Sequence, residues 1–154
     1  MDSERVKEIL DIFHKTGCLF HTRDLFGSVS KGEFFILEKL YDLESAAESP
    51  FLGVTVTQLA KELYLSKATM SKLLRIVERK NYIIRTPDDR DRRIVYIRLS
   101  EEGRILLLAS RERVESVMGS LLDSLGDSDS RELIRIMRRL LTAAESNILF
   151  QNKK

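Results

Sequence analysis

Several features typical of secreted and membrane-spanning proteins are scarce or missing in this 154-residue sequence, which has one cysteine, two prolines and no tryptophan. Because a single cysteine cannot form an intramolecular disulfide, a reducing environment is the simplest expectation. The longest uninterrupted apolar run, at 105–109, spans five residues, whereas a transmembrane helix needs about 20. The N-terminus is polar and lacks the pattern of a secretory signal. We therefore expect a cytoplasmic protein that does not enter the membrane, with one domain or one domain and an appendage.

The sequence signatures of enzymes are also missing. There is no glycine-rich phosphate loop, no metal-binding cluster and no convincing Ser/His/Asp set. The two histidines, His14 and His21, are seven residues apart, but zinc usually takes three or four protein ligands. The sequence therefore predicts a protein that is not an enzyme and that holds no cofactor and no metal.

Charge is unevenly placed along the chain, although the net charge is only +2. The segment from Ser66 to Leu99 holds ten lysines and arginines and four acidic residues, which gives it +6 and leaves −4 for the rest of the chain. A basic segment on an acidic chain is typical of a surface that binds a polyanion. A solvated surface can carry the same charge, so local structure has to decide between the two.

Two short helices follow each other between residues 55 and 81. Thr55 and Gln58 match a capping box that opens the first helix. Ser66 is the predicted N-cap of the second, which runs to about residue 80 and ends at Asn81, a residue that tolerates the left-handed conformation. Two short helices joined by a tight turn make a helix-turn-helix.

A β-hairpin follows this pair of helices. Residues 82–85 and 94–99 are rich in β-branched and aromatic side chains, and apolar residues alternate in the second segment. The loop between them, 86–93, carries three arginines and three aspartates. The expected fold class is mainly α with a small β-hairpin, that is, a winged helix-turn-helix.

Apolar residues at helical spacing predict further helices on both sides of this motif. They cover 4 to about 26, 30 to about 44, 100 to about 125 and 129 to about 150, and a loop is expected at 45–53. The second of them begins with a capping box of Ser30 and Glu33. In the last of them, the residues expected to face inward are Leu133, Ile136, Met137, Leu140 and Leu141.

The predicted helix at 66–80 has one apolar face and one face suited to DNA. The B-DNA major groove admits an α-helix, whose N-terminal residues reach the base edges. Arginine and lysine can donate to guanine, serine can bind a base or a phosphate, and small residues allow close approach. The candidate DNA-binding residues are Ser66, Lys67, Ala68, Thr69, Ser71, Lys72 and Arg75. A polar, solvated face would look the same, but the hairpin that follows favours DNA binding.

The charges of the hairpin loop fit a probe of the flanking DNA. Arg90, Arg92 and Arg93 are candidates for contact with the backbone or with a narrow minor groove, where the negative potential is enhanced. Asp88 and Asp91 are candidates to brace the loop, because a carboxylate paired with one arginine can direct another guanidinium outward.

Taken together, these motifs resemble the MarR (multiple antibiotic resistance regulator) family. Asp88-x-Arg90-x-x-Arg93, the alternating residues after it and the LSEEG segment at 99–103 resemble that family's wing, and residues 55–85 resemble its helix-turn-helix. The likeness is close over about residues 30–110, while the outer helices match only in arrangement. Asn81 stands where the family usually has glycine, and the 45–53 loop is longer and more acidic than usual.

The resemblance implies a homodimeric transcriptional regulator, most commonly a repressor, that binds an inverted-repeat operator in double-stranded DNA. It implies a winged-helix DNA-binding domain at 30–99 and a helical dimerisation region made of 1–29 plus 100–154. Residues 66–80 are then the recognition helix, and Arg90 is the arginine that enters the minor groove. The residues themselves agree on a dimer, because the first and the last two helices carry more apolar surface than one small core covers.

The resemblance also implies release from DNA by a small aromatic or phenolic effector or, in one branch, by oxidation of an N-terminal cysteine. The candidate effector-pocket residues are Phe13, Phe20, Phe34 and Phe35, for which ordinary core packing is the preferred interpretation. Cys18 lies near the position of the reactive cysteine of that branch. The tyrosine expected four residues later is Thr22 here, and His14 is a substitute partner. We expect a buried, inert thiol.

Two other functions of a winged helix stay open at this stage. The first is a protein-docking module, which has no need of three arginines in its wing and does not bind DNA. The second is architectural DNA binding, which shows little preference for any sequence over a scrambled one.

Overall fold

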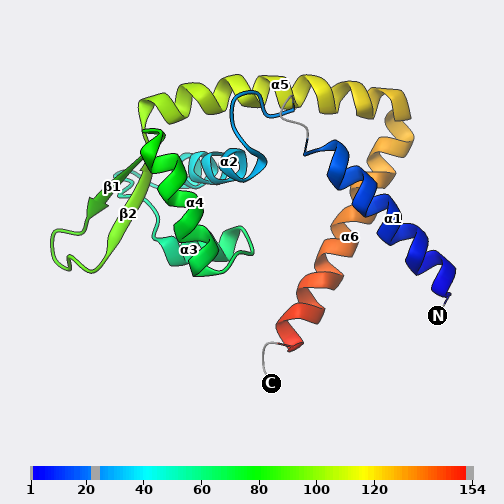
Figure 1. The fold of residues 1–154 in the computed structure, drawn as a ribbon, viewed down its shortest axis with the longest axis horizontal. Helices are drawn as coiled ribbons and strands as arrows, with labels where there is room; N and C mark the ends of the chain where they lie inside the picture. The colour runs from blue at the N-terminus through cyan, green and yellow to red at the C-terminus, as the bar shows by residue number, and fades with distance from the viewer. Residues whose placement is uncertain (1, 22–24, 152–154) are drawn as a thin grey trace. The chain divides into compact units, whose positions relative to one another are not determined.

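The computed structural model describes residues 2–21 and 25–151, which are mainly α-helical with one small sheet (Figure 1). The elements are α1 (Ser3–Leu19), α2 (Lys31–Ala46), α3 (Val56–Glu62), α4 (Lys67–Arg79), β1 (Ile83–Pro87), β2 (Val95–Leu99), α5 (Glu101–Leu125) and α6 (Asp127–Gln151). The chain divides into two compact units, 1–114 and 115–154. The predicted fold class is confirmed, because α3 and α4 form a helix-turn-helix and β1 and β2 form its wing.

Short polar side chains begin the helices of the winged helix. At α2 the predicted capping box is complete: the Glu33 N–H donates to Ser30 Oγ at 3.2 Å, and the Ser30 N–H donates to the Glu33 carboxylate at 2.6 Å. At α3, Thr55 Oγ1 accepts from the Gln58 N–H at 3.2 Å. Asn81 adopts the predicted left-handed conformation, with φ at 60°.

The wing is a two-stranded antiparallel sheet with a third segment attached to its edge. Ile83 lies opposite Leu99, and Pro87 lies opposite Val95. Val54, just before α3, forms a bridge with Ile97 through two backbone hydrogen bonds of 3.0 and 2.8 Å. This bridge, which the sequence did not reveal, ties the wing to the start of the helix-turn-helix.

The apolar core of the 1–114 unit is built from α2, α3, α4, the sheet and the first turns of α5. Its most deeply buried large side chains are Ile36, Leu37, Leu40, Leu59, Met70, Leu74, Ile97 and Leu107. Full burial of one such side chain contributes about 1.5–3 kcal/mol. This shared core therefore holds the helix-turn-helix and the wing in one fixed arrangement.

The first turn of α5 packs closely against the residues that follow α4. Ser100 donates from its N–H to the Tyr82 carbonyl at 3.1 Å and from its hydroxyl to the Asn81 carbonyl at 2.6 Å. Its Oγ also accepts from the Gly103 N–H at 2.9 Å. A Cβ at Gly103 would overlap the Tyr82 carbonyl oxygen, so only glycine fits at this point of close approach.

Three predicted boundaries differ from the observed ones. The first helix ends at Leu19 rather than near residue 26, because the Phe20 and His21 N–H groups turn back to the Thr16 and Cys18 carbonyls. The second helix extends two residues into the predicted loop. Between α5 and α6 the GDSDS segment breaks the helix only at Gly126 (φ +83°), because its aspartates and serines already belong to α6.

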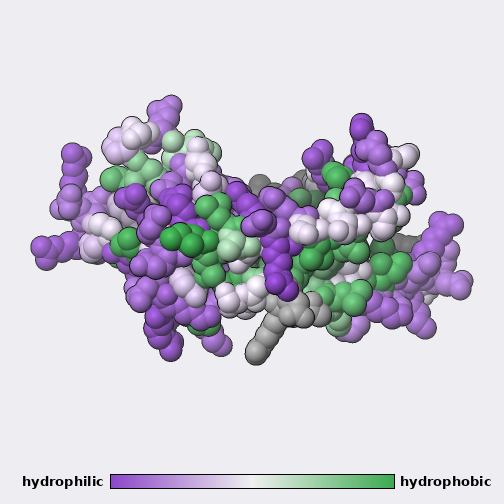
Figure 2. Space-filling model, turned by 90° about the horizontal axis from the view of Figure 1, so that it is seen from above, coloured by the Kyte–Doolittle hydropathy of each residue, from purple (hydrophilic) through white to green (hydrophobic). Residues whose placement is uncertain are grey.

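Apolar side chains of α1, α5 and α6 reach the surface of the single chain. On the face shown in Figure 2, hydrophobic residues (green) are exposed beside hydrophilic ones (purple). The prediction that α6 turns its apolar residues inward is wrong for one copy. Five of its exposed residues are Leu133, Ile136, Met137, Leu140 and Leu141. The reason is that none of the α6 side chains that the structure describes, up to residue 147, is buried in a core of its own unit. Among the described helices, none is long and apolar enough to cross a membrane.

Candidate nucleic-acid interface

Helix α4 carries its buried and its exposed residues on opposite faces. Met70, Leu74 and Val77 are buried in the core and fix the helix. Of the candidate residues on the other face, Ser71 is half-buried and the rest are exposed: Ser66, Lys67, Ala68, Thr69, Lys72 and Arg75. The side chains that suit DNA thus stand on one solvent-facing side of a helix held firmly from behind.

Two of these candidates also build the start of α4. Ser66 Oγ accepts from the Thr69 N–H at 3.1 Å and lies 2.8 Å from Thr69 Oγ1. This N-cap orders the first turn of the helix. Their hydroxyls are therefore partly occupied, and Lys67, Lys72 and Arg75 are the side chains of this face best able to donate to a ligand.

The C-terminal end of α4 is held by a partly buried ion pair, between a buried glutamate and an exposed lysine, that sequence reasoning missed. Lys80 Nζ lies 2.5 Å from a carboxylate oxygen of Glu33, whose exposed fraction is 3%. Burial by itself raises the pKa of Glu33. The hydrogen bond from Lys80, the hydrogen bond from the Ser30 N–H and the charge of Lys80 lower it by more, so the net shift of the pKa is downward. Glu33 thereby links the start of α2 to the end of α4.

The wing loop is shaped by Asp88. Its carboxylate accepts from the backbone N–H groups of Arg90 and Asp91, both at 2.8 Å. These two hydrogen bonds lower the pKa of Asp88, the bond from Asp91 most strongly. Backbone hydrogen bonds of 2.9 Å, from Asp88 to the Ile94 carbonyl and from Ile94 to the Asp91 carbonyl, close the loop. These hydrogen bonds therefore fix the backbone of the loop at Arg90.

One wing arginine is paired within the loop. Arg93 donates to Asp91 through Nε at 2.9 Å and through Nη2 at 3.0 Å, a bidentate contact. The hydrogen bonds from Arg93 lower the pKa of Asp91, and the same contact raises the pKa of Arg93. Arg90 and Arg92 are exposed in the same loop, and the Arg93 side chain is exposed as well although it is paired. The loop therefore presents Arg90 and Arg92 while Arg93 is engaged with Asp91.

Another ion pair connects the wing to α4. Arg85 on β1 donates through Nε to Glu78 on α4 at 2.9 Å. Neither residue was among the candidates from the sequence. The pair joins α4, which carries candidate DNA-binding residues, to the strand that leads into the wing loop.

Helix α2 is joined to α5 through Tyr41. The guanidinium groups of Arg104 and Arg111 lie 5.5 and 4.6 Å from the centre of its ring. Arg104 also pairs with Glu44 at 2.6 Å, and Arg111 with Glu38 at 2.8 Å. Tyr41 itself is half-buried.

The four candidate phenylalanines have different surroundings. Phe34 is buried in the core, Phe20 packs against it, and Phe13 and Phe35 are exposed. A ring cluster does form, with Phe34 5.0 Å from Phe26 and 5.5 Å from Phe35. Phe26, absent from the candidates, is the third member of the cluster and contacts both Phe34 and Phe35.

Cys18 is exposed, so the prediction of a buried thiol is wrong for the single chain. It lies near the end of α1, none of whose residues is buried. Its Sγ is 3.8 Å from His14 Nε2, one turn earlier. Thr22, at the position where the redox branch has tyrosine, lies outside the described residues.

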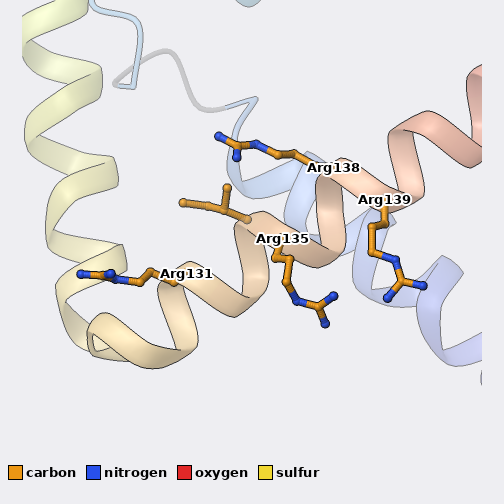
Figure 3. A pocket seen from close by; sticks show the side chains of 5 residues that line it. Arg131, Arg135, Arg138 and Arg139 are labelled. Atoms are coloured by element: carbon orange, nitrogen blue, oxygen red, sulfur yellow. The ribbon is translucent and has the colours of Figure 1, made fainter.

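A second basic cluster lies on α6. Arg131, Arg135, Arg138 and Arg139 surround Ile134 at a shallow surface depression, and Figure 3 shows their side chains pointing in different directions. Arg131 pairs with Asp127 at 3.0 Å, and Arg135 pairs with Glu132. These guanidinium groups do not converge on one point, so they do not form a compact anion site.

Comparisons with known proteins agree with this geometry. A model of the MarR family matches residues 29–95. The HTH-type transcriptional regulator SarZ of Staphylococcus epidermidis is 25% identical over 89 residues, which are 58% of this chain and 59% of SarZ. The organic hydroperoxide resistance transcriptional regulator of Bacillus subtilis is 28% identical over 93 residues, 60% of each chain. The chain therefore spans about 60% of the length of these curated relatives.

A solved structure shares the fold over nearly the whole chain. The structure of Streptococcus pneumoniae FabT in complex with DNA superimposes with a TM-score of 0.71 and 22% identity, and it covers 94% of this chain and 99% of FabT. At this identity the likeness establishes the fold alone.

Proposed function

The winged-helix region of this chain belongs to the MarR family, and from this premise we propose that the protein is a sequence-specific, DNA-binding transcriptional regulator. The observation that carries the proposal is the pairing of two basic surfaces on one rigid core. One is the exposed face of α4, and the other is the internally braced wing loop. The FabT relative with the same fold was solved with DNA.

In this proposal α4 lies in the major groove. Lys67, Lys72 and Arg75 donate to base edges or phosphates, and Ala68 and Ser71 allow close approach. Ser66 and Thr69 order the first turn and offer their remaining hydrogen-bonding capacity to the backbone. Residues 30–99 form the DNA-binding domain.

The wing reads the flanking minor groove. Arg90 enters the groove, since Asp88 fixes its backbone, and Arg92 contacts the sugar–phosphate backbone. Arg93 serves mainly to hold the loop through Asp91. We assign Arg93 this different role from Arg90 and Arg92 because of its bidentate contact with Asp91.

We propose that two copies bind an inverted-repeat operator. Residues 1–29 and 100–154 form the dimerisation region, and a second copy covers the apolar side chains that one chain leaves exposed on α1, α5 and α6. A closed two-fold pair buries the same faces of both copies. It places two recognition helices about 34 Å apart, one turn of DNA.

Regulation by a small aromatic effector is the next part of the proposal, with repression as the mode of action. The Phe26–Phe34–Phe35 ring cluster supports binding of an aromatic effector, because the exposed ring of Phe35 is held in place by the buried rings of Phe26 and Phe34. Redox control through Cys18 is a second candidate. The exposure of its thiol and its proximity to His14 favour it.

The experiment that tests DNA binding is a salt series of fluorescence anisotropy titrations with labelled duplex DNA. We expect Arg90→Ala to weaken binding and to lower the slope of log affinity against log salt by about 1. The matched control is Arg5→Ala, which removes one exposed arginine from α1. Absence of DNA binding by the unmodified protein would identify a protein-docking module instead.

A further inference from the structure

Ile76 is an exposed isoleucine on α4, the helix that we assign to the major groove. Its exposed fraction is 36%, whereas Met70, Leu74 and Val77 of the same helix are buried in the core. The structure describes every residue of α4, and among the exposed side chains of this helix Ile76 is the one that is both large and apolar. Packing of the core therefore does not account for an isoleucine at this position.

The neighbours of α4 leave one face of the helix open. On one side lies the start of α2, since a Cβ at Gly32 would be 3.5 Å from Leu73 Cδ2. On the other side lies β1, whose Arg85 pairs with Glu78 at 2.9 Å. Beyond the first turn of α4, the exposed side chains of the open face are Lys72, Arg75, Ile76 and Arg79.

Ile76 lies between positive charges on this open face. At about 100° of rotation per residue, it is about 40° from Lys72, one turn earlier, and about 60° from Arg79, one turn later. Neither Lys72 nor Arg79 forms an ion pair with an acidic residue in the described part of the chain, so both are available to DNA phosphates. With both cations bound to a duplex, the side chain between them is held against it.

An isoleucine side chain suits one feature of the major groove. It has no hydrogen-bond donor or acceptor, so it cannot bind a phosphate oxygen or the polar atoms of a base edge. The apolar group that base pairs display in the major groove is the C5-methyl of thymine. Contact between this methyl group and Ile76 removes apolar surface of both from water, which is favourable.

We propose that Ile76 packs against the C5-methyl group of a thymine in each half of the operator and thereby selects a T·A pair at that position. The inference rests on the proposed DNA-binding function. It adds a specificity-determining residue to a face that otherwise offers basic and hydroxyl groups. Lys72 and Arg79 contribute affinity for any duplex through phosphates, whereas Ile76 contributes a preference for one base pair.

The expected signature is a change in base preference without a change in salt dependence. Uracil is thymine without its methyl group and keeps the same hydrogen-bonding edge, so replacing thymine by uracil isolates the methyl contact. Loss of one such contact should lower the affinity about fourfold. Because Ile76 is uncharged, its replacement should not alter the slope of log affinity against log salt.

The probe for the test is the duplex that the unmodified protein enriches most strongly from a pool of random sequences. Each thymine of this duplex is replaced in turn by uracil, and anisotropy titrations compare the unmodified protein with Ile76→Ala and Ile76→Gln. At one thymine in each half-site, we expect uracil to weaken binding by the unmodified protein about fourfold. The same uracil should not affect either variant, because the variant and the modification remove the same contact.

Ile84→Ala is the matched control. Ile84 is an isoleucine on β1 with an exposed fraction of 52%, so its replacement removes the same side chain outside α4 and should leave the uracil effect intact. Thermal unfolding checks the fold of all the variants. Ile76→Ala should be at least as stable as the unmodified protein, since the position is exposed and alanine favours helix more than isoleucine.

A uracil effect that persists in both Ile76 variants, or the lack of any thymine at which the effect depends on Ile76, overturns the inference. Failure of the unmodified protein to enrich any sequence from the pool refutes the proposed sequence-specific function itself. The two failures are therefore distinguishable.

Discussion

Single residues decide how tightly the helices of the winged helix can approach one another. The sequence revealed the N-caps at Ser30, Thr55 and Ser66, because each depends on side chains three residues apart. It did not reveal the Glu33–Lys80 ion pair, whose partners are 47 residues apart in the chain. Nor did it reveal the requirement for glycine at position 103, which arises only when α5 meets the Tyr82 carbonyl.

We predict that Gly103→Ala destabilises the protein by about 2–3 kcal/mol, because the added methyl group forces α5 away from Tyr82. Urea unfolding followed by circular dichroism measures the change. The control is Gly119→Ala on the same helix, where a Cβ meets no neighbouring atom. That control should be neutral or stabilising by up to about 1 kcal/mol, since alanine favours helix more than glycine. Equal effects of both variants would disprove the close approach at Gly103.

The Glu33–Lys80 ion pair should make stability depend on pH in the acidic range. The pKa of Glu33 in the folded protein lies below the ordinary value of about 4.5, so the unfolded chain binds the proton more readily. The stabilisation is therefore complete above the ordinary pKa and is lost as the pH falls through the folded-state value. Measured by urea unfolding between neutral and acidic pH, Glu33→Gln should lack this part of the pH dependence. Glu112→Gln, at an exposed position on α5, should retain it.

At the scale of elements, the wing shows which features of a loop can be predicted. Its strands and turn followed from alternation and composition, and its aspartates were expected to pair with its arginines. The sequence left open which pair forms, because three arginines and three aspartates lie within a few residues of each other. In the structure Asp91 pairs with Arg93, whereas Asp88 accepts hydrogen bonds from backbone N–H groups. The anchoring of the wing by Val54 was unpredictable, since one bridging residue leaves no periodic signal.

We predict that two substitutions in the wing, each removing one negative charge, act differently on DNA binding. Asp89→Asn should strengthen it slightly, because it removes repulsion from the phosphates. Asp91→Asn should bind about threefold more weakly than Asp89→Asn, because Arg93 loses its partner and the loop becomes less ordered. Anisotropy titrations of both variants at one salt concentration provide the comparison. If the two bind equally well, Asp91 has no bracing role.

At the scale of the whole molecule, the outer helices carry an excess of apolar surface. The sequence indicated this excess correctly, but it assigned the residues of α6 to an inward face. Helical periodicity identifies an apolar stripe, but it does not reveal whether the same chain or another copy covers it. Leu140 on α6 and Ile9 on α1 are both more than 40% exposed. These faces are the basis of the proposed dimer.

We predict that Leu140→Glu weakens self-association, because it places a charge in the proposed apolar interface. Sedimentation velocity should show a dimer for the unmodified protein and a larger monomer fraction for the variant. DNA affinity should fall with it, since the two recognition helices then bind independently. The control is Ser128→Glu, an exposed polar position in the first turn of α6. A monomeric unmodified protein would contradict the dimer.

The central claim is sequence-specific DNA recognition, and the most direct test is a comparison of two labelled duplexes of equal length at physiological salt. One comes from upstream of the protein's own gene, and the other is its scrambled sequence. The account predicts a preference of about 10³ or more for the native fragment. Equal, salt-sensitive binding to both duplexes, repeated across the upstream regions of neighbouring genes, would contradict it and indicate architectural DNA binding.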